Sequence, residues 1–549
     1  MKGQGGAGIL SASGGQRVFF LSALIIVVLV AFGAGFPEAF GHAAGAALGK
    51  ISHLFGWFYL LAVFGFVIFL GGLALSKYGK VRLGPQDSTP TYGTFSWISM
   101  LLAAGFGVGL VFYGMAEPMS HFASPPYGDV AAETPEAARY AIQVAYFNWG
   151  VHQWAAFSLV GLIIAYFQFR KGQAGLVSSV LSSVTARRPW LRPYTDSLDV
   201  FAVVATVMGV ATSLGLGVLQ TNGGLHAVFG LPENAWWQFV ILLCMFLAYM
   251  ASTWSGLDKG IKRLSNLNMI LCIAMMLYVL FTGPTVQILE TITLGIGDYL
   301  QNFIGMSLRL SPYDGNDWAS QWTVFYWAWV IAWSPFVGTF VARVSRGRTI
   351  REYVLGVLVV PPLLACLWIG VFGGAALHME LGGDVGLAAA TQNNITVALF
   401  SMFDQMPFSS LLSVMAMCLI FIFLVTSADS ASFIVAQMTD DGSIEPPLYK
   451  RVLWGALIAA ICFTLIAAGG LEGLQSAAVL SALPFSFILF MMVWVLVKEL
   501  RADRKAMLAQ LYRRHGETPV GADPFEAETL ADEERLRRAP NVVNRRINH

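Results

Sequence analysis

Twelve long apolar runs divide this 549-residue chain, and they constrain its fold more than any other feature. A helix of about 20 apolar residues spans the hydrocarbon core of a bilayer. Only helices and closed barrels satisfy all backbone hydrogen bonds in lipid, and the alternating pattern of barrel strands is absent from the sequence. The runs, numbered one to twelve, are 17–36, 54–76, 94–116, 138–168, 199–220, 236–253, 265–287, 321–342, 353–377, 409–436, 452–470 and 474–497. The sequence therefore predicts an all-α integral membrane protein with twelve transmembrane helices.

Composition and motifs exclude several other classes of protein. Only 12% of the residues are charged, about half the fraction found in soluble proteins. The formal net charge of +1 offers no basic surface for nucleic acid. All five cysteines lie inside apolar runs without metal-site spacing, which argues against a disulfide scaffold. Nucleotide-binding loops, zinc-protease motifs and nucleophile elbows are missing from the sequence, so we expect no enzyme and no nucleic-acid partner.

Loop charges predict the orientation of these helices. Lys and Arg gather in the loops after the even-numbered runs, whereas the loops after the odd-numbered runs are nearly free of them. Cytoplasmic loops carry the excess of positive charge. We therefore expect a multi-pass protein of the bacterial inner (plasma) membrane with both termini in the cytoplasm. The residues are Lys77, Lys80, Arg82, Arg170, Lys171, Arg187, Arg188, Arg192, Lys259, Lys262, Arg263, Arg343, Arg346, Arg348, Arg351, Lys450, Arg451, Lys498 and Arg501.

Two segments are not expected to cross the membrane. Residues 291–320 contain three aspartates and several leucines, which predict a periplasmic helix or loop along the membrane surface. The tail, 498–549, holds 11 Lys or Arg and 9 Asp or Glu. Such a charge pattern favours a solvated helix with disorder. A regulatory role competes with this interpretation, because basic residues such as Arg535, Arg537 and Arg538 can bind anionic membrane lipid.

Glycines alternate with other residues in the middle of run three, at Gly105, Gly107 and Gly109. Each glycine costs a helix about 1 kcal/mol relative to alanine, so the three predict a locally unwound stretch. Unwound backbone at membrane depth is tolerated where it lines a cavity, and its N–H and C=O groups can bind a carboxylate or a small cation. The alternative is that these glycines only permit close helix packing.

Tryptophans lie in the middle of two runs rather than at the membrane interfaces. Trp149 and Trp154 belong to run four, and Trp329 and Trp333 belong to run eight. Trp329 and Trp333 are four residues apart and therefore share one helix face. Tryptophan faces are the best cation–π partners, and aromatic cages hold quaternary ammonium groups. Bulky core packing explains such residues equally well.

Run ten carries polar side chains that suit a cation. Thr426 and Ser427 offer hydroxyl oxygens, which hard cations prefer, although such hydroxyls usually bond back to their own helix. Asp429 is an acid in or near the membrane and therefore a functional candidate, with a helix-pairing role as the alternative. His152 in run four is expected to be a hydrogen-bonded packing residue.

Together these segments resemble the betaine–choline–carnitine transporter family, especially its sodium-coupled glycine betaine members. The segments occur in the family's order and cover runs two to twelve, and the tryptophan segment of run eight is the most specific. They are Gly105–Pro118 (GFGVGLVFYGMAEP), Asn148–Trp154 (NWGVHQW), Gly209–Gly217 (GVATSLGLG), Trp327–Gly338 (WAWVIAWSPFVG), Ser345–Glu352 (SRGRTIRE) and Thr426–Ser430 (TSADS).

The resemblance implies a LeuT-like fold of two inverted five-helix repeats behind two extra N-terminal helices, and it implies a homotrimer. Residues 1–16 are then a cytoplasmic segment and 17–92 the two extra helices. Residues 93–290 form the first repeat and 321–497 the second. Runs three and eight become the first helix of each repeat, interrupted by the glycines and by Pro335 respectively.

The resemblance also implies a substrate site. Residue by residue, it assigns the aromatic substrate positions to Trp149, Trp154, Trp329 and Trp333, with Phe157 beside them. The unwound backbone of Gly105, Gly107 and Gly109 is expected to bind the carboxylate of the substrate.

A site for a sodium ion, the expected coupling ion, is implied as well. It maps to the backbone carbonyls of Ala103, Phe106 and Phe423 and to the hydroxyls of Thr426 and Ser427. Run five carries no arginine, which sodium-independent carnitine exchangers have in place of the ion.

Some positions depart from the family pattern. Phe157 replaces a tyrosine and Val210 a threonine, so two oxygen ligands of a second sodium site are missing, although Thr206 is present. Val330 replaces a tryptophan next to Trp329, which changes the shape of the aromatic box.

Gly109 stands where choline-specific members carry an aspartate. Without that charge, a zwitterion fits the site better than a cation, because a buried charge needs a counter-charge. Alternatively, Gly109 only lets two helices touch, and Asp429 or Glu117 balances a cationic substrate.

The sequence thus predicts a secondary active symporter that imports a small zwitterionic solute together with sodium. A quaternary-ammonium or sulfonium compound is expected, with glycine betaine as the leading substrate. The alternatives are a proton-coupled choline importer, an osmosensing membrane receptor and an integral membrane enzyme.

Overall fold

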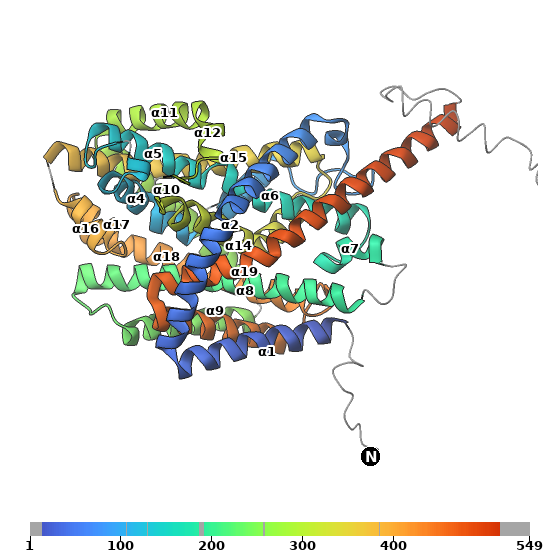
Figure 1. Cartoon of the computed structure of the whole chain (residues 1–549), viewed down its shortest axis with the longest axis horizontal. Helices are drawn as coiled ribbons and strands as arrows, with labels where there is room; N and C mark the ends of the chain where they lie inside the picture. Colours follow the sequence, from blue (N-terminus) through green and yellow to red (C-terminus); the bar gives the residue numbers. More distant parts are fainter. Residues whose placement is uncertain are drawn as a thin grey trace, which may run out of the picture. The chain divides into compact units, whose positions relative to one another are not determined.

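The computed structural model describes residues 14–105, 107–128, 130–185, 192–255, 258–313, 315–383 and 385–515. These residues are helical apart from loops and one antiparallel bridge, between Arg82 and Thr349. The chain divides into two compact units, Met1–Leu489 and Phe490–His549. The predicted all-α class is confirmed, and Figure 1 shows the helices in chain order by colour.

The helices of the first half reach from the N-terminal segment to run seven. They are α1 (Gly14–Gly35), α2 (Pro37–Leu75), η2 (Lys77–Lys80), α3 (Thr94–Gly105), α4 (Val108–Ala123), η3 (Pro126–Gly128), α5 (Pro135–Trp149), α6 (Val151–Ala165), η4 (Tyr166–Arg170), α7 (Val177–Thr185), α8 (Arg192–Phe229), α9 (Ala235–Ser255) and α10 (Asp258–Thr282).

The second half begins with three helices, α11 to α13, that precede the helix of run eight. Its helices are α11 (Thr285–Gln301), α12 (Phe303–Ser307), α13 (Trp318–Gln321), α14 (Thr323–Val344), α15 (Ile350–Gly383), α16 (Leu387–Asn393), α17 (Ala398–Asp404), α18 (Ser409–Met438) and α19 (Leu448–His515). The predicted helix in the segment after run seven is present as α11, which packs against α5 and α15 (Figure 1).

Ten helical segments of the described residues are long and apolar enough to cross a membrane. Run three is not among them, because it is divided between α3 and α4, each shorter than 18 residues. Runs eleven and twelve both lie in α19, where Gly470 has non-helical φ and ψ of 55° and −130°. The chain is therefore a multi-pass membrane protein, and the count of twelve crossings stays a prediction.

The predicted unwinding of run three is confirmed. α3 ends at Gly105 and α4 begins at Val108, and Gly107 between them is extended, with φ −142° and ψ 167°. Run four is broken as well, at Gly150, where φ is −83° and ψ −141°. A Cβ at Gly150 would lie 2.7 Å from the Tyr299 hydroxyl, so only glycine fits this break.

The predicted interruption of run eight at Pro335 is wrong. α14 continues from Thr323 to Val344 with Pro335 inside it. A proline removes one backbone hydrogen bond from a helix, and the Pro335 carbonyl still accepts from the Thr339 hydroxyl at 2.7 Å. Three alternating glycines weaken a helix at three positions, which explains why run three unwinds and run eight does not.

Glycines bring α14 close to two neighbouring helices. α14 packs against α6 and α8 in the core of the larger unit. A Cβ at Gly161 in α6 would lie 2.9 Å from the Gly338 carbonyl, and one at Gly209 in α8 would lie 2.8 Å from the Trp333 backbone nitrogen. These close approaches fix the position of the tryptophans of α14.

The loop between α14 and α15 is held against the segment that follows α2. Gly347 N–H donates to the Leu83 carbonyl at 2.8 Å, and Leu83 N–H donates to the Arg348 carbonyl at 2.8 Å. Gly347 has a positive φ of 85°, and a Cβ there would overlap the Thr89 carbonyl. The segment 345–352, which carries one of the family motifs, thus holds the start of α15 against the segment that follows α2.

Replacing Gly347 by alanine is expected to destabilise the protein by about 1–3 kcal/mol, because the side chain must occupy a strained backbone conformation. The midpoint of thermal unfolding in detergent measures the effect. Gly71 in α2 is the matched control, since a Cβ there meets nothing within 4 Å. Gly71→Ala should leave the midpoint unchanged or raise it. Equal midpoints for the Gly347 and Gly71 variants would contradict the assignment.

Candidate functional site

The five aromatic residues assigned to the substrate site form one continuous line of ring contacts, called here the ring line. Trp154 contacts Phe157 with ring centroids 5.3 Å apart, and Phe157 contacts Trp333 at 5.8 Å. Trp333 stacks on Trp329 at 6.2 Å and 10°, and Trp329 meets Trp149 edge-on at 6.2 Å and 84°. Four of the side chains are buried, and Trp333 is half-buried. Helices α5, α6 and α14 thus bring these residues together.

The glycine break of run three faces the ring line. A Cβ at Gly107 would lie 3.6 Å from Trp333 Cη2, which is an ordinary contact. A Cβ at Gly109 would overlap the Trp329 ring and lie 3.0 Å from Trp149 Cη2. Gly109 therefore makes room for the rings, as the close-packing alternative requires. Gly105 is the last residue of α3.

The break also supplies polar backbone groups next to the rings. α4 begins at Val108, and the first N–H groups of a helix have no partner within it. The Leu110 N–H donates to the Gly107 carbonyl at 3.1 Å, so the N–H groups of the residues before it belong to the open end. The positive end of a helix attracts an anion. Aromatic faces and a helix N-terminus together match a molecule with a positive and a negative end.

Three further side chains support the ring line. Trp329 Nε1 donates to the Ser213 hydroxyl at 3.1 Å, and Trp149 Nε1 donates to Glu117 Oε2 at 2.6 Å. The Tyr326 ring lies 5.3 Å from that of Trp149. The sequence offered a signal for Tyr326, which lies three residues before Trp329 on one helix face, and for Glu117, an acid directly after an apolar run.

The residues assigned to sodium are only partly described. Phe423 and Thr426 lie in α18, and the Thr426 hydroxyl donates to the carbonyls of Ile422 at 2.9 Å and Phe423 at 3.1 Å. Ser427 is half-buried in the same helix. Ala103 lies in α3, whereas Phe106 lies outside the described residues. The bond of Thr426 to its own helix is the arrangement that most membrane hydroxyls adopt.

α18 nevertheless approaches the glycine break. A Cβ at Gly217 of α8 would lie 3.0 Å from Leu424 Cγ and 3.1 Å from Val108 Cγ1. Leu424 follows Phe423, and Val108 is the first residue of α4. The assigned oxygen atoms of run ten therefore lie in the same region as the broken end of run three.

The remaining polar candidates serve packing. Asp429 in α18 accepts from Ser252 at 3.3 Å and from Thr253, both in α9, which is the helix-pairing alternative. His152 bonds to the Ser307 hydroxyl at 2.7 Å and stacks on Trp327, as expected of a packing residue.

Two residues at the positions of the second sodium site, Thr206 and Val210, contact only the interior of the protein. The Thr206 hydroxyl donates to the Ala202 carbonyl at 2.7 Å, and the Val210 side chain is buried.

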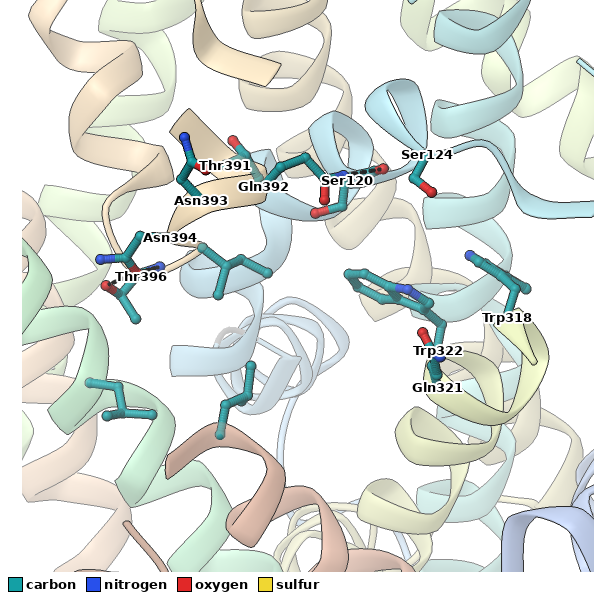
Figure 2. A pocket seen from close by; sticks show the side chains of 13 residues that line it. Ser120, Ser124, Trp318, Gln321, Trp322, Thr391, Gln392, Asn393, Asn394 and Thr396 are labelled. Carbon is teal, nitrogen blue, oxygen red and sulfur yellow. Dashed lines mark hydrogen bonds between the residues drawn. The ribbon is translucent and has the colours of Figure 1, made fainter. Parts of the chain in front are cut away.

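A cavity of about 530 Å³ lies between α4, α13 and α16. Figure 2 shows Asn394 and Thr396 across the cavity from Trp318 and Trp322, with Ser120 and Ser124 at its edge. The charge pattern predicts that the loops and helix ends around this cavity lie outside the cell.

The cavity connects to the ring line through aromatic contacts. Trp322 contacts Tyr326 at 6.2 Å, and Tyr326 contacts Trp149 at 5.3 Å. A chain of ring contacts therefore runs from the wall of the cavity to the ring line.

Comparisons with known proteins agree with this geometry. An ectoine/hydroxyectoine transporter of Virgibacillus pantothenticus is 51% identical over 89% of this chain and 97% of its own length. The glycine betaine transporter OpuD of Bacillus subtilis is 44% identical over 89% of this chain and 95% of its own length. A glycine betaine transporter of Acinetobacter baylyi is 40% identical over 90% of this chain and 74% of its own length. These relatives are transporters, not enzymes.

One solved structure and one family profile complete the comparison. A manganese transporter mutant of Eremococcus coleocola matches with a TM-score of 0.40 and 16% identity over 83% of this chain and 97% of that one, a level that assigns no fold. The profile of the betaine/carnitine/choline family transporters matches residues 17–505. The chain belongs to the betaine/carnitine/choline transporter family.

Proposed function

We propose that this chain is a symporter that imports a zwitterionic compatible solute together with sodium. Glycine betaine is the leading substrate, and the 51% identity to an ectoine/hydroxyectoine transporter makes ectoine the second candidate. The observation that carries the proposal is the ring line, which is closed on one side by the glycine break. This arrangement offers aromatic faces for a cationic head and a helix N-terminus for a carboxylate.

The ring line binds the positive end of the solute. Trp329 and Trp333 are stacked, and Trp149 stands edge-on to Trp329, so the planes of the rings are set in two directions. Each cation–π contact in a desolvated site stabilises the head by up to about 2 kcal/mol. A methylated ammonium group has no N–H donors to satisfy, so apolar ring faces surround it without leaving a donor unpaired.

The first turn of α4 binds the negative end. Its N–H groups start at Val108, beside Gly107 and close to the rings. Choline has no carboxylate to place there, and the described residues of the break offer no negative side chain. A zwitterion therefore satisfies both ends of the site, and a cation satisfies one.

Run ten supplies the sodium ligands in this proposal. The hydroxyls of Thr426 and Ser427 and the Phe423 carbonyl bind the ion together with carbonyls at the end of α3. Thr426 exchanges its bond to its own helix for this role, which a rotation about its side chain accomplishes. Because the oxygens come from two helices, they bind an ion well only when α18 and the broken run three are correctly placed. That requirement links the ion to the solute.

The membrane topology, the repeats and the oligomeric state are also part of the proposal. Twelve crossings with both termini in the cytoplasm, two inverted five-helix repeats and a homotrimer follow the family resemblance. The ring line joins residues of runs four and eight, one from each repeat, which supports a site between the repeats. The cavity between α4, α13 and α16 supports entry from the outer side.

Uptake into liposomes tests the function. Purified protein should accumulate labelled glycine betaine or ectoine when a sodium gradient is imposed, and choline should enter poorly. Replacing sodium by potassium at constant pH should abolish the accumulation. Uptake that persists in potassium but follows a pH gradient would favour a proton-coupled importer. Absence of uptake for all these solutes would favour the receptor alternative.

Replacing both Thr426 and Ser427 by alanine should raise the sodium concentration needed for half-maximal uptake, because two oxygen ligands are lost. Ser430 of the same helix bonds to the Thr426 carbonyl at 2.9 Å, is exposed and is the matched control. Ser430→Ala should leave the sodium dependence unchanged. If the double variant and Ser430→Ala changed the sodium concentration for half-maximal uptake equally, the assigned ligands would be wrong.

Replacing Trp329 by leucine should weaken solute binding by roughly 30-fold, the equivalent of about 2 kcal/mol for one desolvated contact. Phenylalanine keeps an aromatic face and should preserve part of the affinity. Both variants lose the bond to Ser213, so their difference isolates the ring. Equal affinities for the leucine and phenylalanine variants would show that size alone matters.

Replacing Gly109 by alanine should raise the KM for the solute at least about tenfold, because overpacking in a tight core costs about 1–3 kcal/mol and displaces the Trp329 ring. Gly107→Ala is the matched control, since its Cβ meets Trp333 at an ordinary 3.6 Å. That variant should keep a KM within about twofold of the parent. Equal KM values for the two variants would mean that Trp329 does not set the binding geometry.

A further inference from the structure

Glu117 is fully buried in α4 and accepts hydrogen bonds from four side chains. Its Oε1 accepts from Asn148 Nδ2 at 2.8 Å and from His121 Nε2 at 3.3 Å. Its Oε2 accepts from Trp149 Nε1 and from the Tyr326 hydroxyl, both at 2.6 Å. One carboxylate therefore joins α4, α5 and α14, the three helices that meet at the outer end of the ring line.

Two more hydrogen bonds set the direction of these donors. The Thr323 hydroxyl donates to Asn148 Oδ1 at 3.2 Å, so the amide presents its NH₂ group to Glu117. Trp318 Nε1, which can only donate, lies 3.3 Å from His121 Nδ1. The Nδ1 atom must then accept, and the ring proton is on Nε2, toward Glu117. His121 is thus a neutral imidazole.

In the part of the chain that the structure describes, every donor to Glu117 is therefore uncharged. Four donors match the lone pairs of an ionised carboxylate, and among them only the Tyr326 hydroxyl could accept a proton from a neutral acid. An ionised Glu117 has only neutral donors around it, at a depth where a charge is costly. No packing role needs that charge, because neutral groups would join the same helices at lower cost.

We propose that Glu117 is a positioning residue that acts through Trp149 and sets the preference of the ring line for a positively charged head group. The inference deepens the proposed function and rests on it. The 2.6 Å bond fixes the Trp149 indole beside Trp329. A negative charge at the indole N–H makes the ring face more attractive to a cation and adds direct attraction in the low dielectric of the site.

Two probes of the same shape test this role. Glycine betaine has a charged trimethylammonium head, and 3,3-dimethylbutanoate has a neutral carbon in place of its nitrogen. In Glu117→Gln, the dissociation constant of betaine should rise about tenfold, because a charge is removed from a low-dielectric site. The inhibition constant of 3,3-dimethylbutanoate should stay the same or fall, since its own negative charge is no longer repelled. Equal weakening of both probes would overturn the proposal.

Two more variants separate charge from shape. Glu117→Asp keeps the charge. The ratio of the betaine dissociation constant to the 3,3-dimethylbutanoate inhibition constant should therefore stay near that of the parent, even if both compounds bind more weakly. Glu380→Gln is the matched control. Glu380 is also a buried carboxylate, but it accepts from the backbone N–H groups of Leu387 at 2.8 Å and Ala388 at 3.2 Å, away from the ring line. Its variant should leave the ratio unchanged, and a ratio altered as in Glu117→Gln would overturn the proposal.

A double-mutant cycle tests the route through Trp149. Trp149→Phe keeps an aromatic face but cannot donate to Glu117. In the Trp149→Phe background, Glu117→Gln should weaken betaine binding by less than about threefold instead of tenfold. The reason is that the effects of replacing two interacting residues are not additive. The full tenfold loss in both backgrounds would contradict the route through Trp149. If 3,3-dimethylbutanoate does not compete with betaine, the double-mutant cycle alone decides the question.

The two proposals fail in different ways. A parent protein that binds neither betaine nor ectoine contradicts the proposed function. A parent protein that binds betaine and loses it in Trp329→Leu, but keeps the probe ratio in Glu117→Gln, contradicts only the role of Glu117.

Discussion

Because lipid offers no partner to backbone N–H and C=O groups, a spanning segment leaves its helix only where other protein groups replace the missing bonds. This constraint organises the structure. Most runs remain helical, and the two breaks near the ring line, at Gly107 and Gly150, are enclosed by protein. At Gly150 the Tyr299 hydroxyl accepts from the Val151 N–H at 3.0 Å. The first N–H groups of α4, which have no partner within that helix, thus lie next to the tryptophans, where a solute can use them.

Close pairing of glycine with tryptophan is the second theme of the fold. A Cβ at Gly109 would overlap Trp329, one at Gly356 would overlap Trp97, and one at Gly114 would lie 2.5 Å from Trp368 Nε1. Large rings need a flat neighbour when helices are close, and only glycine leaves that space. These three glycines therefore fix the positions of the tryptophans that pack against them.

Helix propensity and residue spacing along the sequence made part of this structure predictable. Helix propensity alone indicated the break between Gly105 and Val108, and a spacing of four residues indicated the stack of Trp329 and Trp333. Local patterns were misleading at Pro335, because one lost hydrogen bond does not break a helix that is packed on two sides. The hydrogen bonds of Glu117 were beyond reach, since Trp149 and Tyr326 are 32 and 209 residues away in the sequence. Only the tertiary fold brings these donors to one carboxylate.

The break at Gly150 separates the two tryptophans of run four into different helices. Trp149 ends α5 and contacts Trp329, while Trp154 lies in α6 and contacts Phe157. A continuous helix would couple both rings rigidly, so any tilt would move them together. With a break between them, the end of the ring line nearer the cavity and the end farther from it are carried by different helices and are not bound to move as one rigid body. In the proposed transport cycle, this division lets the two ends of the ring line change their contacts with a solute at different times, as a pathway through a membrane needs if it is never to be open to both sides at once.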